Sequence, residues 1–274
     1  MASVVEAAIV TGAAQGIGKS IATSLLKQGY KIFIFDLDLN LGQATAKDLC
    51  QKFGESKATF KKCDVTDKEQ FIGAFNEAVK TCGHISVMVN NAGIADEFNF
   101  EKCIAVNLIG VIQGCNLAID HMRKDKGGKG GIIVNVASMA AVDAHFILPT
   151  YCATKSGSLQ FTRAWSKNPK CEEYGLTFMC LCPGFVDTEM VRTGGPHCLN
   201  PNIFELAKSS GLLKSEETAV LPKVRTTRLE TIEDAFLKLM NDKQNGSVLE
   251  VSIFRIEYLK QPSVMQVNND KETS

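Results

Sequence analysis

The sequence lacks the features of several large classes of protein. Its 30 lysines and arginines balance its 30 aspartates and glutamates, so a nucleic acid or a membrane surface is disfavoured as the main partner. Its 10 cysteines include no Cys-x-x-Cys pair, so zinc-site spacing is absent and we expect no metal. No uninterrupted apolar run approaches the roughly 20 residues of a membrane span, and no N-terminal targeting signal is visible. We therefore expect a cytoplasmic protein with reduced thiols.

The composition is sufficient for one large hydrophobic core. Of the 274 residues, 45% are apolar, which makes one domain likelier than two. We expect a single domain over residues 1–260 with a lid at about 188–215. The segment 261–274 is polar and is expected to be a tail.

A glycine-rich turn near the N-terminus indicates an anion-binding site. An apolar, strand-like run over residues 7–10 is followed by Gly12, Gly16 and Gly18 and then by a helical pattern. Without side chains at these positions, a phosphate can approach the backbone N–H groups at the helix N-terminus, where the helix dipole favours an anion. The alternative is a strand–helix turn that needs glycine only for its backbone angles.

The next expected strand, residues 31–35, ends in Asp36. A carboxylate at this point can accept hydrogen bonds from an adenosine ribose, and it would repel a 2′-phosphate. Asp38 adds to that repulsion, and Gln15 in the glycine turn is not a cation. These residues favour NAD over NADP. The alternative is that Asp36 only turns or caps the chain after the strand.

Strand-like and helical segments alternate along the chain. Expected strands cover 58–62, 85–89, 131–138 and 248–254, and expected helices cover 41–53, 68–81, 103–124 and 231–240. This alternation predicts an α/β fold of the Rossmann type, in which a doubly wound parallel sheet forms the middle of three layers. Because ligands bind at the carboxyl ends of such strands, we expect one crevice lined by Thr11, Asp36, Asp64, Asn91 and Ser138.

Tyr151 and Lys155 are the candidate reacting pair. Residues four apart on a helix lie on the same side, and a neighbouring ammonium favours the phenolate form of tyrosine. Tyr151 could then take the proton from a secondary alcohol while hydride leaves for a nicotinamide. Ser138, at a strand end, could hold the substrate oxygen. The alternative is a surface Tyr–Lys pair, since any helix can show this spacing by chance.

As a set, these motifs resemble the short-chain dehydrogenase/reductase family over about residues 5–190. They are Gly12-x-x-x-Gly16-x-Gly18, Asn90-Asn91-Ala92-Gly93, Asn107, Ser138, Tyr151-x-x-x-Lys155 and Pro183-Gly184. The resemblance implies that Tyr151 is the acid/base and that Lys155 lowers its pKa and binds the nicotinamide ribose. It also implies that Ser138 positions the substrate oxygen and that Asn107 supports a water-linked proton path to Lys155.

The resemblance also implies which residues contact NAD. Asp64 and Val65 would flank the adenine, Asn91 would lie on the adenosine side, and residues 183–188 would close over the nicotinamide carboxamide. The expected set is Gly12, Gln15, Gly16, Ile17, Gly18, Asp36, Leu37, Cys63, Asp64, Val65, Asn91, Ala92, Gly93, Tyr151, Lys155, Pro183, Gly184, Val186 and Thr188.

Within the family, residues 11–18, 130–133, 151–153 and 182–186 are similar to members that oxidise a hydroxyl group of prostaglandins. Those members have a glutamine three residues before the tyrosine, where this chain has Leu148, so we do not transfer the prostaglandin substrate. We expect a lipophilic alcohol or ketone, held by Ser138, Leu148, Tyr151, Phe185 and Met190. Simple, terpenoid or steroid alcohols are the alternative substrates.

A different class of function is an NAD-binding sensor or partner-binding module without turnover. The complete set of Ser138, Tyr151, Lys155 and Asn107 argues against it.

The stretch after Thr188 is expected to decide specificity. Gly194-Gly-Pro196 lies beside apolar residues over 203–213, which fits a hinged lid over a hydrophobic substrate. An ordinary surface loop is the alternative, and His197 could be a polar contact of the lid. In the family, the final strand and helix often form a subunit contact, so a homodimer or homotetramer is implied.

Overall fold

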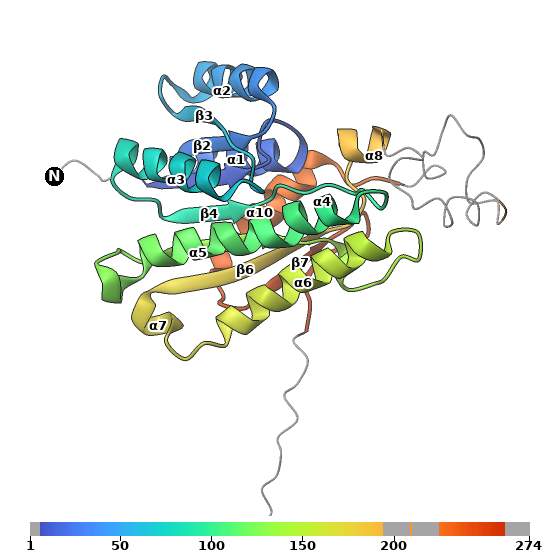
Figure 1. The fold of residues 1–274 in the computed structure, drawn as a ribbon. Coiled ribbons are helices and arrows are strands. Elements are labelled where there is room, and N and C mark those ends of the chain that lie inside the picture. The colour runs from blue at the N-terminus through green and yellow to red at the C-terminus, as the bar shows by residue number, and fades with distance from the viewer. Residues whose placement is uncertain (1–5, 194–208, 210–224, 261–274) are drawn as a thin grey trace, which may run out of the picture.

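An eight-stranded sheet forms the centre of the protein in this computed structural model, which describes residues 6–193, 209 and 225–260 (Figure 1). Its strand order is β3-β2-β1-β4-β5-β6-β7-β8. The first seven strands are parallel, and β8 is antiparallel to β7. The strands are β1 Ala7–Thr11, β2 Lys31–Asp36, β3 Ala58–Lys62, β4 Val87–Asn90, β5 Gly131–Val136, β6 Leu176–Pro183, β7 Val248–Val251 and β8 Ile256–Tyr258.

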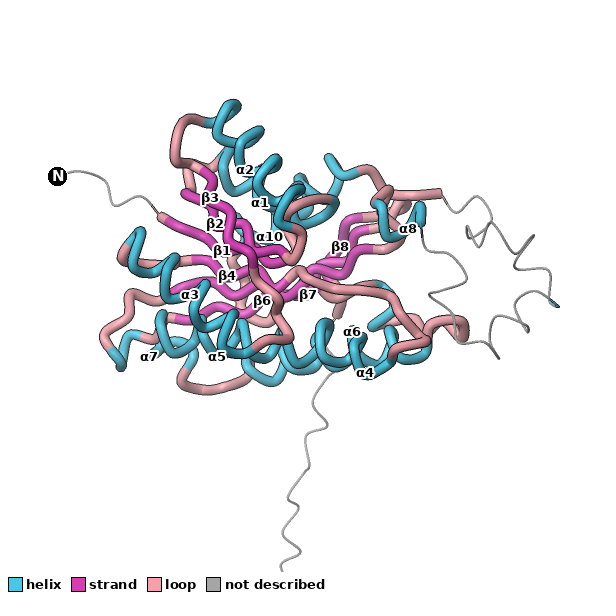
Figure 2. Tube along the Cα trace, turned by 45° about the horizontal axis from the view of Figure 1, so that its top comes forward, coloured by secondary structure: helices cyan, strands magenta, loops and turns pink. Residues whose placement is uncertain are grey.

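Helices cover both faces of this sheet (Figure 2). One face carries α1 Gly16–Lys27, α2 Leu39–Phe53 and α10 Leu229–Asp242, and the other carries α3 Lys68–Cys82, α5 Gly110–Met122 and α6 Pro149–Ser166. Shorter helical segments are α4 Phe100–Ile104, η1 Ala105–Ile109, η2 Lys124–Lys126, η3 Met139–Ala141, α7 Cys171–Tyr174 and α8 Glu189–Thr193. The predicted three-layer, doubly wound fold is confirmed.

The strands are apolar throughout because both of their faces are buried. In β1, Ala8 and Val10 belong to the core under α1 and α10, whereas Ala7 and Ile9 belong to the core under α3 and α5. Successive side chains of a strand point to opposite faces, and a parallel sheet covered on both sides therefore gives continuous apolar runs.

The order of the strands reverses beside β1, which pairs with β2 on one side and with β4 on the other. The chain therefore leaves the carboxyl ends of β1 and β4 in opposite directions and opens a crevice between them. At this point the Thr11 hydroxyl accepts hydrogen bonds from the backbone N–H groups of Asn91 and Ala92, each at 3.0 Å.

The end of the sheet differs from the expected strand over 248–254. β7 stops at Val251, and the chain turns back over residues 252–255 into β8. The Ser252 N–H donates to the Arg255 carbonyl at 2.9 Å, which closes a hairpin, and Phe254 at its tip is 84% exposed. The expected strand wrongly included residues 253 and 254, because these apolar residues lie in the turn of the hairpin and not in a strand.

The expected helix over 103–124 is one continuous helical run from Phe100 to Met122 that contains a π-helical turn, η1. By length and hydropathy alone this run could cross a membrane, and 44% of its apolar window is buried in the fold. Its buried residues include Val111, Cys115 and Met122, which belong to the core on this face of the sheet.

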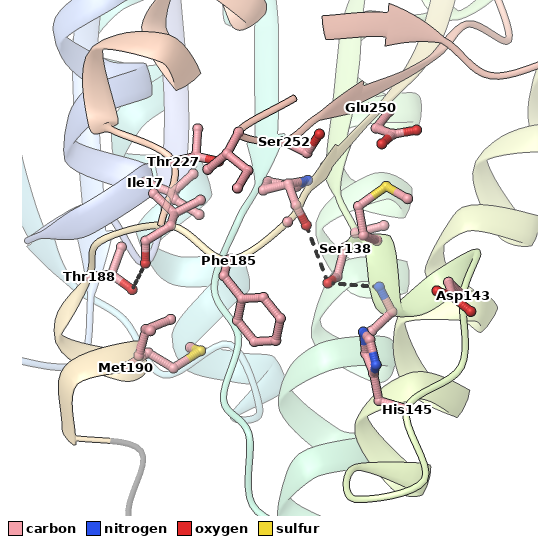
Figure 3. Close-up of a pocket in the computed structure, with 18 of the residues that line it drawn as sticks. Ile17, Ser138, Asp143, His145, Phe185, Thr188, Met190, Thr227, Glu250 and Ser252 are labelled. Carbon is pink, nitrogen blue, oxygen red and sulfur yellow. Dashed lines mark hydrogen bonds between the residues drawn. The ribbon is translucent and has the colours of Figure 1, made fainter. Parts of the chain in front are cut away.

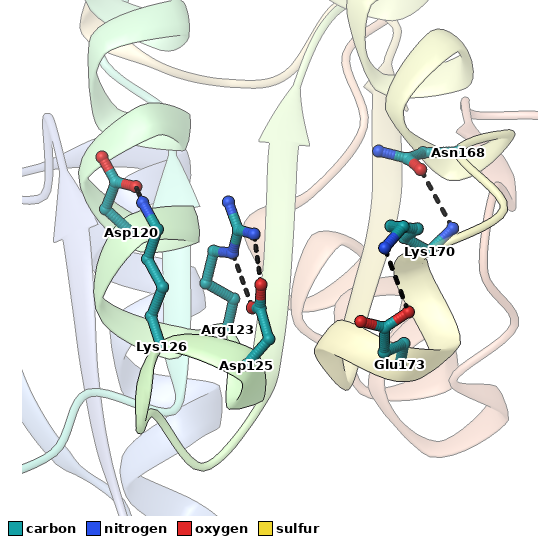
Figure 4. A network of polar contacts seen from close by, with 7 residues as sticks. All are labelled: Asp120, Arg123, Asp125, Lys126, Asn168, Lys170 and Glu173. Atoms are coloured by element: carbon teal, nitrogen blue, oxygen red, sulfur yellow. Dashed lines mark hydrogen bonds and ion pairs between the residues drawn. The ribbon is translucent and has the colours of Figure 1, made fainter.

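Exposed ion pairs fix the turns at the edge opposite the crevice (Figure 4). Arg123 makes a two-pronged contact with Asp125, and its guanidinium lies 4.1 Å from the Tyr174 ring centroid. Lys126 reaches Asp120 at 2.9 Å. These contacts hold the ends of α5 and α7 together, away from the crevice.

The expected lid over 188–215 lies largely outside the described residues, as do His197 and the tail over 261–274. The described part of that segment begins as helix α8. The lid and the single-domain boundary at residue 260 stay predictions.

Candidate active site

The glycine turn between β1 and α1 has no room for side chains. Gly12 and Gly16 have φ of +63° and +56°, in the left-handed region that favours glycine. A Cβ on Gly12 would lie 2.8 Å from the Ala92 Cα, and one on Gly18 would lie 2.3 Å from the Gly12 carbonyl oxygen. The alternative that glycine serves only backbone angles therefore does not cover Gly18, which is needed for close packing.

The N-terminus of α1 suits an anion. Among the described residues no side chain caps it at Gln15, and its first turn contains no acidic residue. Free N–H groups and the positive end of the helix dipole therefore face the crevice. The residues fit the pyrophosphate of a dinucleotide.

Asp36 is tied to this turn. One of its carboxylate oxygens accepts from the Ala14 N–H at 2.9 Å and the other from the Asp38 N–H at 3.1 Å. Each oxygen keeps further acceptor capacity, so the turning role and the ribose-binding role are compatible. Leu37 beside it is 58% exposed.

The remaining expected adenosine residues surround the same end of the sheet. The Asn91 side chain donates to the carbonyl oxygens of Thr11 at 2.9 Å and Gly12 at 3.0 Å, so it holds the glycine turn in place. Cys63 and Val65 are buried, and the Cys63 N–H donates to the Asp36 carbonyl at 2.9 Å. Asp64 accepts from the Thr66 hydroxyl at 2.7 Å.

Asn107 lies in the π-helical turn η1, where the regular backbone pattern of a helix is broken. Its amide exchanges two hydrogen bonds with the backbone of Ile94, both at 2.8 Å, and it also donates to the Thr154 hydroxyl at 3.2 Å. The Ser158 hydroxyl donates to the Asn107 carbonyl at 2.9 Å. An asparagine that is unfavourable in a regular helix is thus fully bonded here.

Lys155 is buried beside Tyr151. The lysine is 3% exposed, its Nζ donates to the Val136 carbonyl at 2.9 Å, and it lies 5.7 Å from the Tyr151 ring centroid. Because a surface pair would be solvated, the alternative of a surface Tyr–Lys pair is excluded. Gly93 lies against both Lys155 and Asn107, since a Cβ there would be 3.2 Å from the Lys155 Nζ and 3.3 Å from the Asn107 Oδ1.

Ser138 follows the carboxyl end of β5. Its hydroxyl accepts from the Ala140 N–H at 3.1 Å and donates to the Pro183 carbonyl at 3.4 Å (Figure 3). Ser138 and Tyr151 line the same cavity.

The pKa values of the pair reflect burial. Burial raises the pKa of Tyr151 to about 12, and the hydrogen bond with Ser138 opposes this rise. Burial also lowers the pKa of Lys155 to about 8. The expectation that Lys155, together with a bound nicotinamidium, favours the phenolate form of Tyr151 stays a prediction.

A cavity of about 820 Å³ opens beside these groups. All five expected substrate residues, Ser138, Leu148, Tyr151, Phe185 and Met190, line it, and so do Ile17, Pro183, Gly184, Val186 and Thr188 from the expected cofactor set. Figure 3 shows Phe185 and Met190 on one side of Ser138 and His145 below it. The walls are mainly apolar, which suits a lipophilic substrate.

Several lining residues were missed by sequence reasoning. They include Ala95, Met139, His145, Arg225, Thr227, Glu250, Ser252 and Arg255. Those from 225 onward lie beyond the resembling region, so no local motif marked them. Arg225 and Thr227 precede α10, where Thr227 pairs with Val186, and Glu250, Ser252 and Arg255 belong to the β7–β8 hairpin. His145 lies 6.0 Å from the Phe185 ring, centroid to centroid, and its position just before Tyr151 was the available signal.

Glu97 was also missed. It is 4% exposed, and it accepts from the backbone N–H groups of Thr150 at 3.0 Å and Tyr151 at 2.8 Å.

Known proteins share this sequence pattern and fold. The family model described as short chain dehydrogenase matches residues 6–198. The 15-hydroxyprostaglandin dehydrogenase [NAD(+)] of Mus musculus is 34% identical over 251 residues, which cover 90% of each chain. The enzyme of the same name from Homo sapiens is 39% identical over 188 residues, which cover 69% of this chain and 71% of that one.

Solved structures agree on the fold. Levodione reductase aligns with a TM-score of 0.74 at 23% identity, covering 90% of this chain and 96% of that one. The protein gox2181 aligns with a TM-score of 0.73 at 22% identity, covering 90% and 94%. Because the family model matches more than half of the sequence and a relative over 30% identical covers 90% of the chain, the chain belongs to the short-chain dehydrogenase family.

Proposed function

We propose that the protein is an NAD-dependent dehydrogenase that transfers hydride between NAD and a secondary alcohol or ketone of a lipophilic molecule. One observation carries this proposal: Ser138 and Tyr151 line an apolar cavity that also reaches Ile17 in the glycine turn, and the buried Lys155 lies 5.7 Å from the Tyr151 ring centroid. The relatives named as NAD(+)-dependent dehydrogenases support the cofactor and the reaction class.

The residues divide the work by position. Gly12, Gly16 and Gly18 admit the pyrophosphate, and Asp36 receives the adenosine ribose. When bound, the nicotinamide ring accepts or supplies the hydride. Tyr151 takes the proton from the substrate hydroxyl, or returns it to a ketone.

Three groups support Tyr151. Ser138 holds the substrate oxygen by a hydrogen bond. Lys155 binds the nicotinamide ribose and favours the phenolate electrostatically, and Asn107 maintains the proton path to Lys155. The apolar cavity walls exclude water from the reacting centre.

The substrate is a lipophilic alcohol or ketone. Leu148 lines the cavity and provides no hydrogen bond there, so we do not propose a prostaglandin as the substrate on the strength of the relatives' names. Simple, terpenoid and steroid alcohols are the candidates to test beside prostanoids, with NADH absorbance as the readout.

The exchange of Tyr151→Phe tests the proposal. It removes the proton carrier and keeps the ring, so turnover should fall by about a thousandfold or more, while the NAD dissociation constant measured by fluorescence stays unchanged. Comparable turnover in this variant would remove Tyr151 as the acid/base. Tight NAD binding without oxidation of any alcohol on the panel would instead favour the sensor or partner-binding module.

The assembly and location are also proposals. We infer a homodimer or homotetramer, supported by the exposed apolar side chains of Phe98, Phe100 and Ile109. Cytoplasmic location is supported by the thiols, because all nine described cysteines are free, as in a reducing compartment.

A further inference from the structure

A buried carboxylate from the loop between β4 and α4 holds the first turn of helix α6, which carries Tyr151. Oε1 of Glu97 accepts the Tyr151 N–H at 2.8 Å, and Oε2 accepts the Thr150 N–H at 3.0 Å. The Glu97 side chain comes from 53 and 54 residues earlier in the chain. The contact is therefore tertiary and is not an ordinary local cap.

The first turn of α6 needs such a partner. The first N–H groups of a helix have no acceptor within the helix, and in α6 the N-cap residue Leu148 makes no side-chain cap within the described structure. Pro149 has no N–H, and the Cys152 N–H already bonds the Leu148 carbonyl at 2.9 Å. Glu97 thus takes the two remaining donors, and its charge lies at the positive end of the helix dipole.

The same loop also holds Asn107. Three residues before Glu97, the backbone of Ile94 makes both 2.8 Å bonds with the Asn107 amide. Between them, Asp96 turns the loop by accepting the N–H groups of Phe98 and Asn99. One short loop, which includes Gly93 beside Lys155, therefore fixes Asn107 at one point and the backbone of Tyr151 at another.

We propose that Glu97 is a positioning residue for hydride transfer, which sets the place of the Tyr151 phenol relative to Asn107 and Lys155. It acts through the backbone of the first turn of α6. This role rests on the proposed function, because it requires Tyr151 to be the acid/base. A shift of about 1 Å in a reacting group can cost about a hundredfold in rate.

The test compares Glu97→Ala, Glu97→Gln and a matched control, Asp67→Ala. Asp67 caps α3 by accepting the Gln70 N–H at 3.0 Å, and α3 carries none of the proposed catalytic residues. The measurements are the single-turnover rate of hydride transfer at saturating NAD, the NAD dissociation constant and the melting temperature.

We expect Glu97→Ala to slow hydride transfer by about ten- to a hundredfold, with an NAD dissociation constant within about twofold of the wild type. The rate of hydride transfer in Glu97→Gln should lie between those of the wild type and Glu97→Ala, because its Oε1 can still accept one N–H. Asp67→Ala should lower the melting temperature but leave hydride transfer unchanged. Amide exchange of Thr150 and Tyr151 should be faster in Glu97→Ala than in the wild type.

Two results would overturn the role of Glu97 alone. The first is that the wild type is active and that Glu97→Ala leaves either the rate of hydride transfer or the amide exchange unchanged. The other is equal slowing by Asp67→Ala, which would show a general loss of stability. A wild type that oxidises no alcohol would remove the proposed function, and this role with it.

Discussion

At the scale of single residues, we expect Asp36 to favour NAD over NADP. Replacing it by serine removes the charge that would repel a 2′-phosphate, so kcat/KM with NADP should rise roughly tenfold or more. Use of NAD should fall, since the ribose and the Ala14 N–H both lose an acceptor. Initial rates with the two cofactors measure this change, and an unchanged NAD to NADP ratio would contradict the assignment.

Asp38→Asn provides the matched comparison. Asp38 caps α2 by accepting the Leu41 N–H at 2.9 Å, and asparagine keeps that cap while removing the charge. Its effect on the rate with NADP should be smaller than that of Asp36→Ser. Of the two aspartates, Asp36 is the one that is bonded to the glycine turn.

The buried Tyr–Lys pair predicts a directional pH dependence. With the Tyr151 pKa raised to about 12 and the Lys155 pKa lowered to about 8, the phenolate fraction rises with pH, and the ammonium that favours it is lost above about 8. The kcat/KM for alcohol oxidation should therefore climb towards pH 8 and climb less steeply beyond it, since kcat/KM reports free-enzyme groups. Ketone reduction needs the phenol and should not gain from higher pH. Initial rates across this range test both directions, and Lys155→Met should remove the change of slope near 8.

At the scale of elements, the packing of α5 on β4 requires that position 114 has no side chain. A Cβ on Gly114 would lie 2.0 Å from the buried Asn90 Oδ1 and 2.9 Å from the Met88 Cε. Gly114→Ala should therefore lower the free energy of unfolding by about 1–3 kcal/mol. Gly73 in α3 is the control, because its Cβ would meet nothing within 4 Å in the described structure.

Gly73→Ala should raise the free energy of unfolding by about 0.5–1 kcal/mol, since alanine favours a helix interior. Urea unfolding of Gly114→Ala and Gly73→Ala should show changes of opposite sign in the free energy of unfolding. A stable Gly114→Ala would show that α5 can move away from β4.

Elements also show the limits of sequence reasoning. The expected strand over 58–62 matches β3, and the helix over 68–81 matches α3 to within one residue, because hydrophobic period and end signals are local. The hairpin of β7 and β8 was missed. Its turn is stabilised by Arg255, which pairs with Glu250 at 2.9 Å, and the apolar residues at its tip look like strand residues.

At the scale of the whole molecule, the proposed assembly can be measured directly. The chain has a mass of 29.8 kDa, so light scattering should give two or four times that value. Phe98, Phe100 and Ile109 are 54%, 48% and 45% exposed, and exposed apolar groups in proximity often mark an interface.

The double variant Phe100→Ser, Ile109→Ser should lower the mass. In contrast, Ile253→Ser at the hairpin tip should lower the mass only if the final strand forms the contact. A monomeric wild type would contradict the proposal.

The sequence by itself determined the doubly wound fold and the glycine turn, and it predicted the roles of Asp36, Ser138, Tyr151 and Lys155. Each of these depends on local spacing: glycines where a phosphate approaches, a carboxylate at a strand end, two side chains one helical turn apart. Only the tertiary structure decided the rest. It placed Glu97 under the first turn of α6, bonded Asn107 within a π-helical turn, and brought the hairpin to the cavity. These contacts join residues that are far apart in the chain, and their energy comes from burial and satisfied backbone groups, which no local pattern records.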